Sequence, residues 1–93
     1  MDQDNLLYEA NRIVERAAEY RDVGESSLVD RAWAYSNAAL ARQSAGLNRA
    51  VAKGAGLYMT PLATALEQAT AKEAVERDAF EKAYRSYLTK PRG

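Results

Sequence analysis

The stretch GAGLYMTP, residues 54–61, decides the fold because it separates two long helical patterns. Gly54 suits the left-handed position that commonly follows the last turn of a helix. Thr60 followed by Pro61 is typical of a helix start, since threonine caps free N–H groups and proline is tolerated at the first helical position. The stretch therefore predicts a helical hairpin, and the residues on either side set the lengths of its two arms.

Apolar residues recur at helical spacing on both sides of this turn, which predicts one helix over residues 27–53 and another over residues 61–88. Residues 5–21 carry a third, shorter helical pattern, and residues 89–93 form a tail. No strand pattern is present, so we expect an all-α fold. The expected core face of the helix over residues 27–53 consists of Leu28, Val29, Ala32, Trp33, Ala39, Leu40, Leu47, Ala50 and Val51.

The lengths of these helices predict an elongated molecule. A helix of 27 residues is roughly 40 Å long, whereas a compact chain of 93 residues has a radius of gyration of about 12 Å. The helix over residues 5–21 is too short to cover both arms. We therefore expect a single domain over residues 1–93, an elongated three-helix bundle in which the shorter helix packs along part of a long hairpin. The uncovered part needs polar residues or a second chain.

Composition excludes several classes of protein. The chain has no Cys and no His, which excludes disulfides, a thiolate nucleophile and an ordinary zinc site. Its 13 basic and 13 acidic residues cancel, unlike those of a strongly basic nucleic-acid binder. Residues 1–5 are polar and acidic, and no apolar run has the length of a membrane span, so we expect a cytoplasmic protein without a cofactor. Its 19 alanines favour helices but bury little area.

Two carboxylates interrupt the apolar face of the helix over residues 61–88. Glu73 and Glu76 are compatible with exposure to water, with pairing to arginines across an interface, or with acid–base chemistry, and we favour these in that order because unpaired buried carboxylates are costly. Val75 lies on the reverse side of the same helix, which suggests contacts on both sides. Against that, a single exposed valine needs no special explanation.

Basic residues align on the helix over residues 27–53. At 100° per residue they fall within about 40° of one another. This basic stripe consists of Arg31, Tyr35, Arg42, Arg49 and Lys53. One interpretation is a contact line for an acidic partner or a nucleic-acid backbone. The other is a face that flanks the acidic first helix or water. Four charges over nearly 40 Å are sparse for nucleic acid, so we favour the second interpretation.

Three large apolar residues, Leu57, Tyr58 and Met59, lie together in the connection between the two long helices. They either cover the end of the bundle or present an apolar patch to a partner.

Three hypotheses of function follow. The first is a non-enzymatic protein–protein interaction module, such as an adaptor, an assembly subunit or a phage-type inhibitor, which self-associates or docks on a larger protein. The alternative is binding of nucleic acid or another acidic partner through the basic stripe. An enzyme that uses Glu73 and Glu76 ranks last, because the chain lacks a nucleophile–base pair and a cofactor motif.

Overall fold

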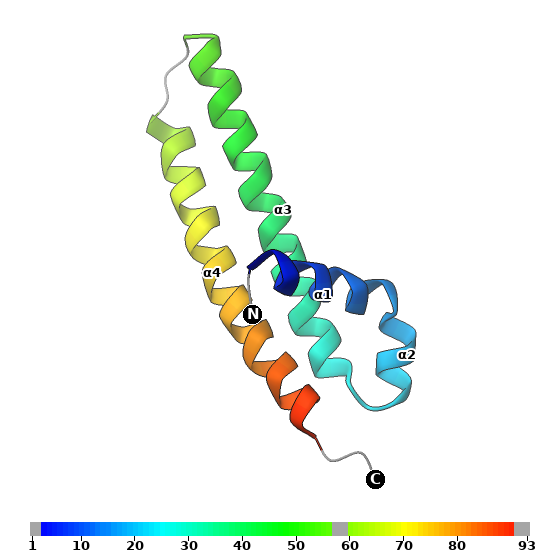
Figure 1. Ribbon diagram of the computed structural model, residues 1–93. Helices are drawn as coiled ribbons and strands as arrows, with labels where there is room; N and C mark the ends of the chain where they lie inside the picture. The colour runs from blue at the N-terminus through cyan, green and yellow to red at the C-terminus, as the bar shows by residue number, and fades with distance from the viewer. Residues whose placement is uncertain (1–2, 57–59, 91–93) are drawn as a thin grey trace.

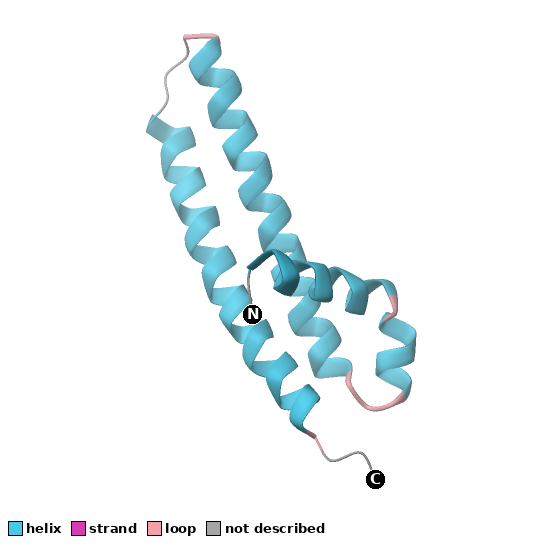
Figure 2. Cartoon of the chain, viewed as in Figure 1, coloured by secondary structure: helices cyan, strands magenta, loops and turns pink. Residues whose placement is uncertain are grey.

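A computed structural model describes residues 3–56 and 60–90. Its helices are α1 (Gln3–Glu15), α2 (Ala17–Asp22), α3 (Ser26–Gly54) and α4 (Thr60–Thr89). The helices α3 and α4 form a long antiparallel hairpin, α1 lies across it, and α2 returns beside the start of α3 (Figure 1). Within these residues there is no strand, which confirms the all-α class (Figure 2).

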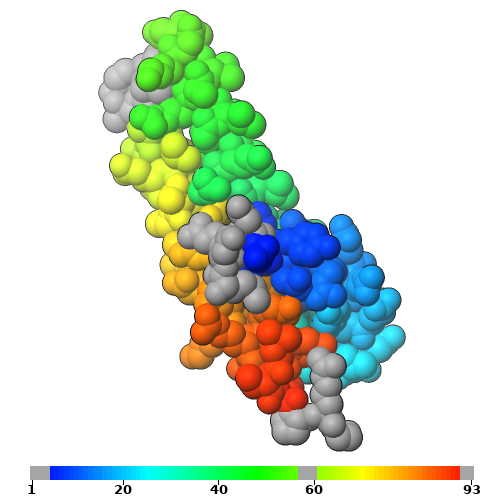
Figure 3. Space-filling model, in the orientation of Figure 1, coloured from blue at the N-terminus to red at the C-terminus, as the bar shows by residue number. Residues whose placement is uncertain are grey.

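The molecule is elongated, with extents of 60 × 20 × 18 Å and a radius of gyration of 16.2 Å, against about 12 Å for a compact chain of this length. The short helices pack on only one end of the hairpin, and the other end projects beyond them (Figure 3). We call the covered end the base: α1, α2, residues 26–39 and residues 76–89. The projecting end, residues 42–56 and 60–72, is the tip.

Nearly all of the large buried side chains lie in the base. Phe80 is fully buried at its centre, with ring centroids 5.9 Å from Tyr35 and 5.6 Å from Tyr84. Around these rings pack apolar residues of α1 and of the first turns of α3, namely Leu6, Ala10, Ile13, Leu28, Val29 and Ala32. This cluster fixes α1 on the hairpin, because it contains residues from α1, α3 and α4 together.

The single helix that we expected over residues 5–21 is wrong in its last third. The chain breaks at Arg16, with φ −109° and ψ 30°, and α2 starts in a new direction. The change of direction lets Tyr20 pack edge-on against Tyr87 at 5.8 Å between centroids. The turn into α3 is then held by ion pairs from Arg21 to Asp30 and from Lys90 to Glu25. The bend at Arg16 thus goes together with packing of α2 against α4.

The end of α3 also differs from the expectation. We predicted the left-handed conformation at Gly54, but α3 includes Gly54, and it is Gly56 that has a positive φ of 72°. The reason is that Ala55 keeps near-helical geometry and donates to the carbonyl of Val51. Both long helices extend one residue further at each end than we expected. Over the described ranges, none of the helices combines the length and the apolar character needed to cross a bilayer.

Candidate interaction surface

Large apolar side chains are exposed along one face of α3. Trp33, Leu40, Leu47 and Val51 are 48%, 58%, 63% and 70% exposed, respectively. We had predicted all of them as core, so this part of the expected core face is wrong. At helical spacing they lie within about 40° of one another and extend over roughly 27 Å. We call these four residues the apolar line.

The apolar line is exposed because α4 packs against the opposite side of α3. That side carries the buried residues Tyr35, Ala38 and Ala52, which lie about 100–200° around the helix from Trp33. Gly46 faces α4 as well, since a Cβ added to it would meet Leu66 Cδ1 at 3.9 Å. Small residues permit close approach of the two helices, whereas the larger leucines on the outer face have no neighbouring helix in the tip.

No charged residue interrupts the outer face of α3 between Trp33 and Val51. Between Trp33 and Val51 the only charged residues are Arg42 and Arg49, and both lie about 160–180° away from the line. One edge of the line carries polar residues without charge, namely Asn37, Ser44 and Asn48. The cores of protein–protein interfaces are depleted in charge in the same way.

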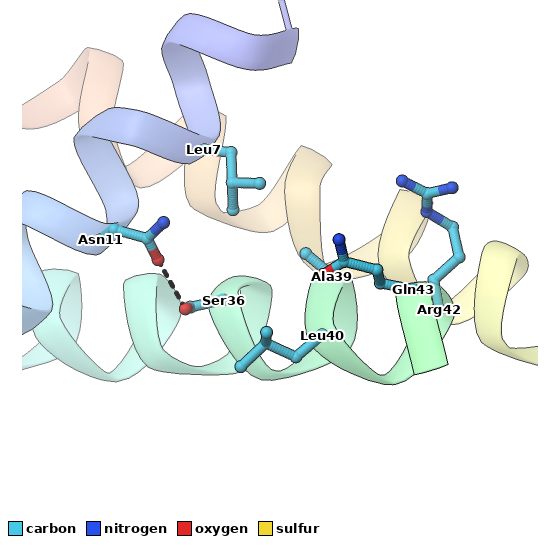
Figure 4. Close-up of a pocket in the computed structure, with 7 residues that line it drawn as sticks. All are labelled: Leu7, Asn11, Ser36, Ala39, Leu40, Arg42 and Gln43. Carbon is cyan, nitrogen blue, oxygen red and sulfur yellow. Dashed lines mark hydrogen bonds between the residues drawn. The ribbon is translucent and has the colours of Figure 1, made fainter. Parts of the chain in front are cut away.

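A hollow of about 300 Å³ adjoins the line where α1 meets α3 (Figure 4). Leu7 projects into it from α1, and Leu40 borders it on α3. Next to them, Ser36 Oγ donates a hydrogen bond of 2.6 Å to Asn11 Oδ1, so this polar pair is satisfied within the chain. An apolar side chain entering the hollow would therefore not have to leave these groups without a partner. The remaining lining residues are Ala39, Arg42 and Gln43.

The structure divides the predicted basic stripe. Tyr35 is 2% exposed and packs on Phe80, so its place on a binding surface is wrong. Arg42 Nε donates to Glu73 Oε2 of α4 at 2.5 Å. At Arg42 the stripe therefore faces α4. We had favoured a face that flanks the first helix or water, and exposure to water holds for the remaining cations. Its other members, Arg31, Arg49 and Lys53, are exposed.

Glu73, Glu76 and Val75 do not form one site. The Glu73 side chain is only 12% exposed and is held by Arg42, so the exposure that we favoured for it is wrong. Glu76 is half-buried beside a hollow of about 370 Å³ that Lys72 also lines, and Val75 is 66% exposed. The Glu73 carboxylate accepts a hydrogen bond from the Arg42 guanidinium of the same chain, so Glu73 is not free to act as a general base. Among the described residues, no three acidic side chains lie together as a metal site would require.

One polar cluster in the base was not foreseen from the sequence. Glu9 Oε2 accepts hydrogen bonds from Arg12 and, at 3.0 Å, from the Tyr84 hydroxyl. Burial alone would raise the pKa of Glu9, but these two donors and the Arg12 charge outweigh it and lower the pKa. Burial and the bond to Glu9 raise the pKa of Tyr84. The i,i+3 spacing of Glu9 and Arg12 is visible in the sequence, whereas the contact with Tyr84 across 75 residues is not.

The apolar connection Leu57, Tyr58 and Met59 lies outside the described residues. Its two interpretations, as a cover of the bundle end or as a patch for a partner, remain predictions.

Comparison of the chain with protein-family models, with curated proteins and with solved structures finds no match.

Proposed function

We propose that the protein is a non-enzymatic protein–protein interaction module, and that the outer face of α3 is its contact surface. The observation that carries the proposal is the apolar line, because four large apolar side chains in an uncharged setting are exposed on one helix face. Large exposed apolar side chains aligned on one helix face are typical of interaction sites rather than of the surface of an isolated monomer. A cytoplasmic location, expected from the sequence, is part of this proposal.

Binding of nucleic acid or of another acidic partner remains the second candidate, but the geometry favours it less. The basic stripe loses Tyr35 to the core and engages Arg42 with Glu73. The cations that remain are spread along α3, and nucleic-acid binding depends on several phosphate contacts made together. Catalysis by Glu73 and Glu76 has the least support, because Glu73 is paired with Arg42 and the sequence offers no nucleophile–base pair beside them.

The test is chromatography with mass detection, on the protein alone and after mixing with a lysate of its source cells. We expect the wild type to have a mass above 10.3 kDa in at least one condition. The double variant Leu47→Lys, Val51→Lys places two charges on the apolar line, so it should stay at the monomer mass in both. Both positions are exposed, and the fold should therefore tolerate the charges.

The matched control is Val75→Lys, which adds a charge at an equally exposed valine on α4. This variant should keep the heavier species. A wild type that remains at 10.3 kDa in both conditions contradicts the proposal. So does a heavier species that the double variant retains in full.

A further inference from the structure

We propose that the occupant of the apolar line is a second copy of this chain, with the two α3 helices packed antiparallel about a two-fold axis. The inference rests on the proposed function and names the partner of the same surface. Two-fold pairing of identical patches is the commonest symmetry of soluble oligomers. The surface area, the charge and the shape of the face each support this partner.

The chain exposes more surface than a compact monomer does, and the excess is about what one such interface would bury. The accessible surface is 6428 Å², whereas a compact monomer of 10.3 kDa has roughly 5,400 Å². The excess is therefore about 1,000 Å², and a standard interface buries about 800 Å² from each partner. A pair of chains joined along the exposed sides of α3 would remove approximately the surface that the elongated shape adds.

The charge distribution suits contact between like faces. A two-fold axis brings the same residues of the two copies together, so a charged face would repel itself. Between Trp33 and Val51 the line and its flanks are uncharged. Arg42 and Arg49 lie on the far side of the helix. Asp30 lies beyond the Trp33 end, where it pairs with Arg21. The net charge of the whole chain is zero, so long-range repulsion between copies is small.

The shape of the surface selects the antiparallel arrangement. The middle of the line falls between Leu40 and Leu47, so an axis there sets Leu40 of one copy against Leu47 of the other. Leu47 of the second copy then lies beside the hollow that Leu7 and Leu40 border. The tip of each molecule extends along the base of the other, where Trp33 is exposed. A parallel pair would instead join the two tips and leave the hollow empty.

The same axis predicts which exposed positions meet. Asn37 and Asn48 flank the line on the same side of α3, and like flanks of antiparallel helices are adjacent. Their midpoint nearly coincides with the axis, so Asn37 of one copy faces Asn48 of the other. In this register Asn37 of one copy and Asn37 of the other are offset by 11 residues, roughly 16 Å along the helix, and the same holds for the two copies of Asn48. A disulfide requires Cα atoms within about 7 Å, so only the mixed pair can form one.

The experiment combines sedimentation of the purified protein with cysteine cross-linking. The chain has no native Cys, so Asn37→Cys and Asn48→Cys each supply one thiol at an exposed site. At about 100 µM, well above a micromolar Kd, the wild type should sediment at twice 10.3 kDa. Oxidation of an equal mixture of the two variants should then give the mixed disulfide at least about 10-fold in excess of either symmetric one. Ser86→Cys on α4 is the control that should not cross-link.

Three outcomes overturn the inference: a wild type that is monomeric at this concentration, symmetric disulfides that form as readily as the mixed one, and cross-linking of Ser86→Cys at the same rate. The first outcome leaves the proposed function intact if the apolar line still governs a heavier complex in the lysate, because the partner is then a different protein. If no complex forms in either condition, both fail.

Discussion

The base and the tip of the molecule are made from the same two helices, yet they are stabilised differently. In the base, Phe80, Tyr35 and Tyr84 stack between helices, and α1 covers them. In the tip, the only buried residue among those described is Ala52. An alanine contributes little buried area, so the tip gains much less stabilisation from burial than the base does.

The two regions also differ in where the large apolar residues of α3 lie. Leu47 and Val51 lie on the outer face of α3, away from α4. On the α3 side, the seam between the tip helices is made of small residues such as Ala52 and Gly46, and Leu66 of α4 packs against Gly46. The core of the base is therefore buried within one chain, whereas the tip leaves Leu47 and Val51 of α3 exposed.

The largest effect is expected in the base. Phe80→Ala should lower the free energy of unfolding by about 3–5 kcal/mol, because it leaves a cavity under two stacked rings. That is a large part of the roughly 5–15 kcal/mol by which a small domain is stable. Urea unfolding followed by circular dichroism measures it. Val75→Ala, five residues away on α4 and 66% exposed, is the control, and it should change stability by less than about 0.5 kcal/mol. Equal effects of the two variants would contradict a core centred on Phe80.

Hydrogen exchange tests the comparison directly. In dilute solution, where the chain is monomeric, amides of residues 42–52 and 62–70 should exchange at least about 10-fold faster than those of residues 28–39 and 76–85. The reason is that few buried apolar contacts oppose local opening of the tip. Mass spectrometry of peptides from the two regions measures the rates. Equal protection along the whole hairpin would contradict the division into base and tip.

A glycine substitution should strengthen the tip. Gly46→Ala puts a better helix former inside α3, and the nearest atom is at ordinary contact distance, 3.9 Å. We expect the tip amides to gain about 0.5–1 kcal/mol of protection while the base amides stay unchanged. Gly56→Ala is the matched control in the same region, because a φ of 72° strains a side chain by roughly 1–2 kcal/mol. Loss of protection in Gly46→Ala would mean that the tip helices lie closer than described.

The smallest effect is a change in acid sensitivity of the base. The pKa of Glu9 in the folded protein lies below its ordinary value of 4.5, despite the opposing effect of burial. The stabilisation from Glu9 is thus complete above pH 4.5 and is lost as the pH falls through the lowered pKa. Glu9→Gln should remove this part of the stability loss between about pH 5 and 3, and Tyr84→Phe should remove some of it. Thermal unfolding across that range measures it, and an unchanged acid profile in Glu9→Gln would contradict the assignment.

The sequence by itself determined the helices and the elongated shape. The glycines and the Thr60–Pro61 pair mark the turn of the hairpin, and helix length follows directly from the number of residues between such signals. Capping and turn signals act within a few residues of sequence, so they predict where a helix ends whatever that helix packs against. The break at Arg16 has no such signal in the sequence, and beyond it Tyr20 of α2 packs against Tyr87 of α4, a contact that local sequence does not predict.

Only the tertiary structure decided which side of α3 faces α4. The pattern of large apolar residues pointed to Leu40, Leu47 and Val51, whereas α4 packs on Tyr35, Ala38 and Ala52. Periodicity shows that a face is apolar but not what covers it, and alanines lie on both flanks of this helix, at about 80–140° to either side of Trp33. The choice depends on how closely two helices approach when small residues meet, and on the Arg42–Glu73 pair that joins them across 31 residues. The exposed line is the consequence of that choice, and it is the feature on which function is proposed.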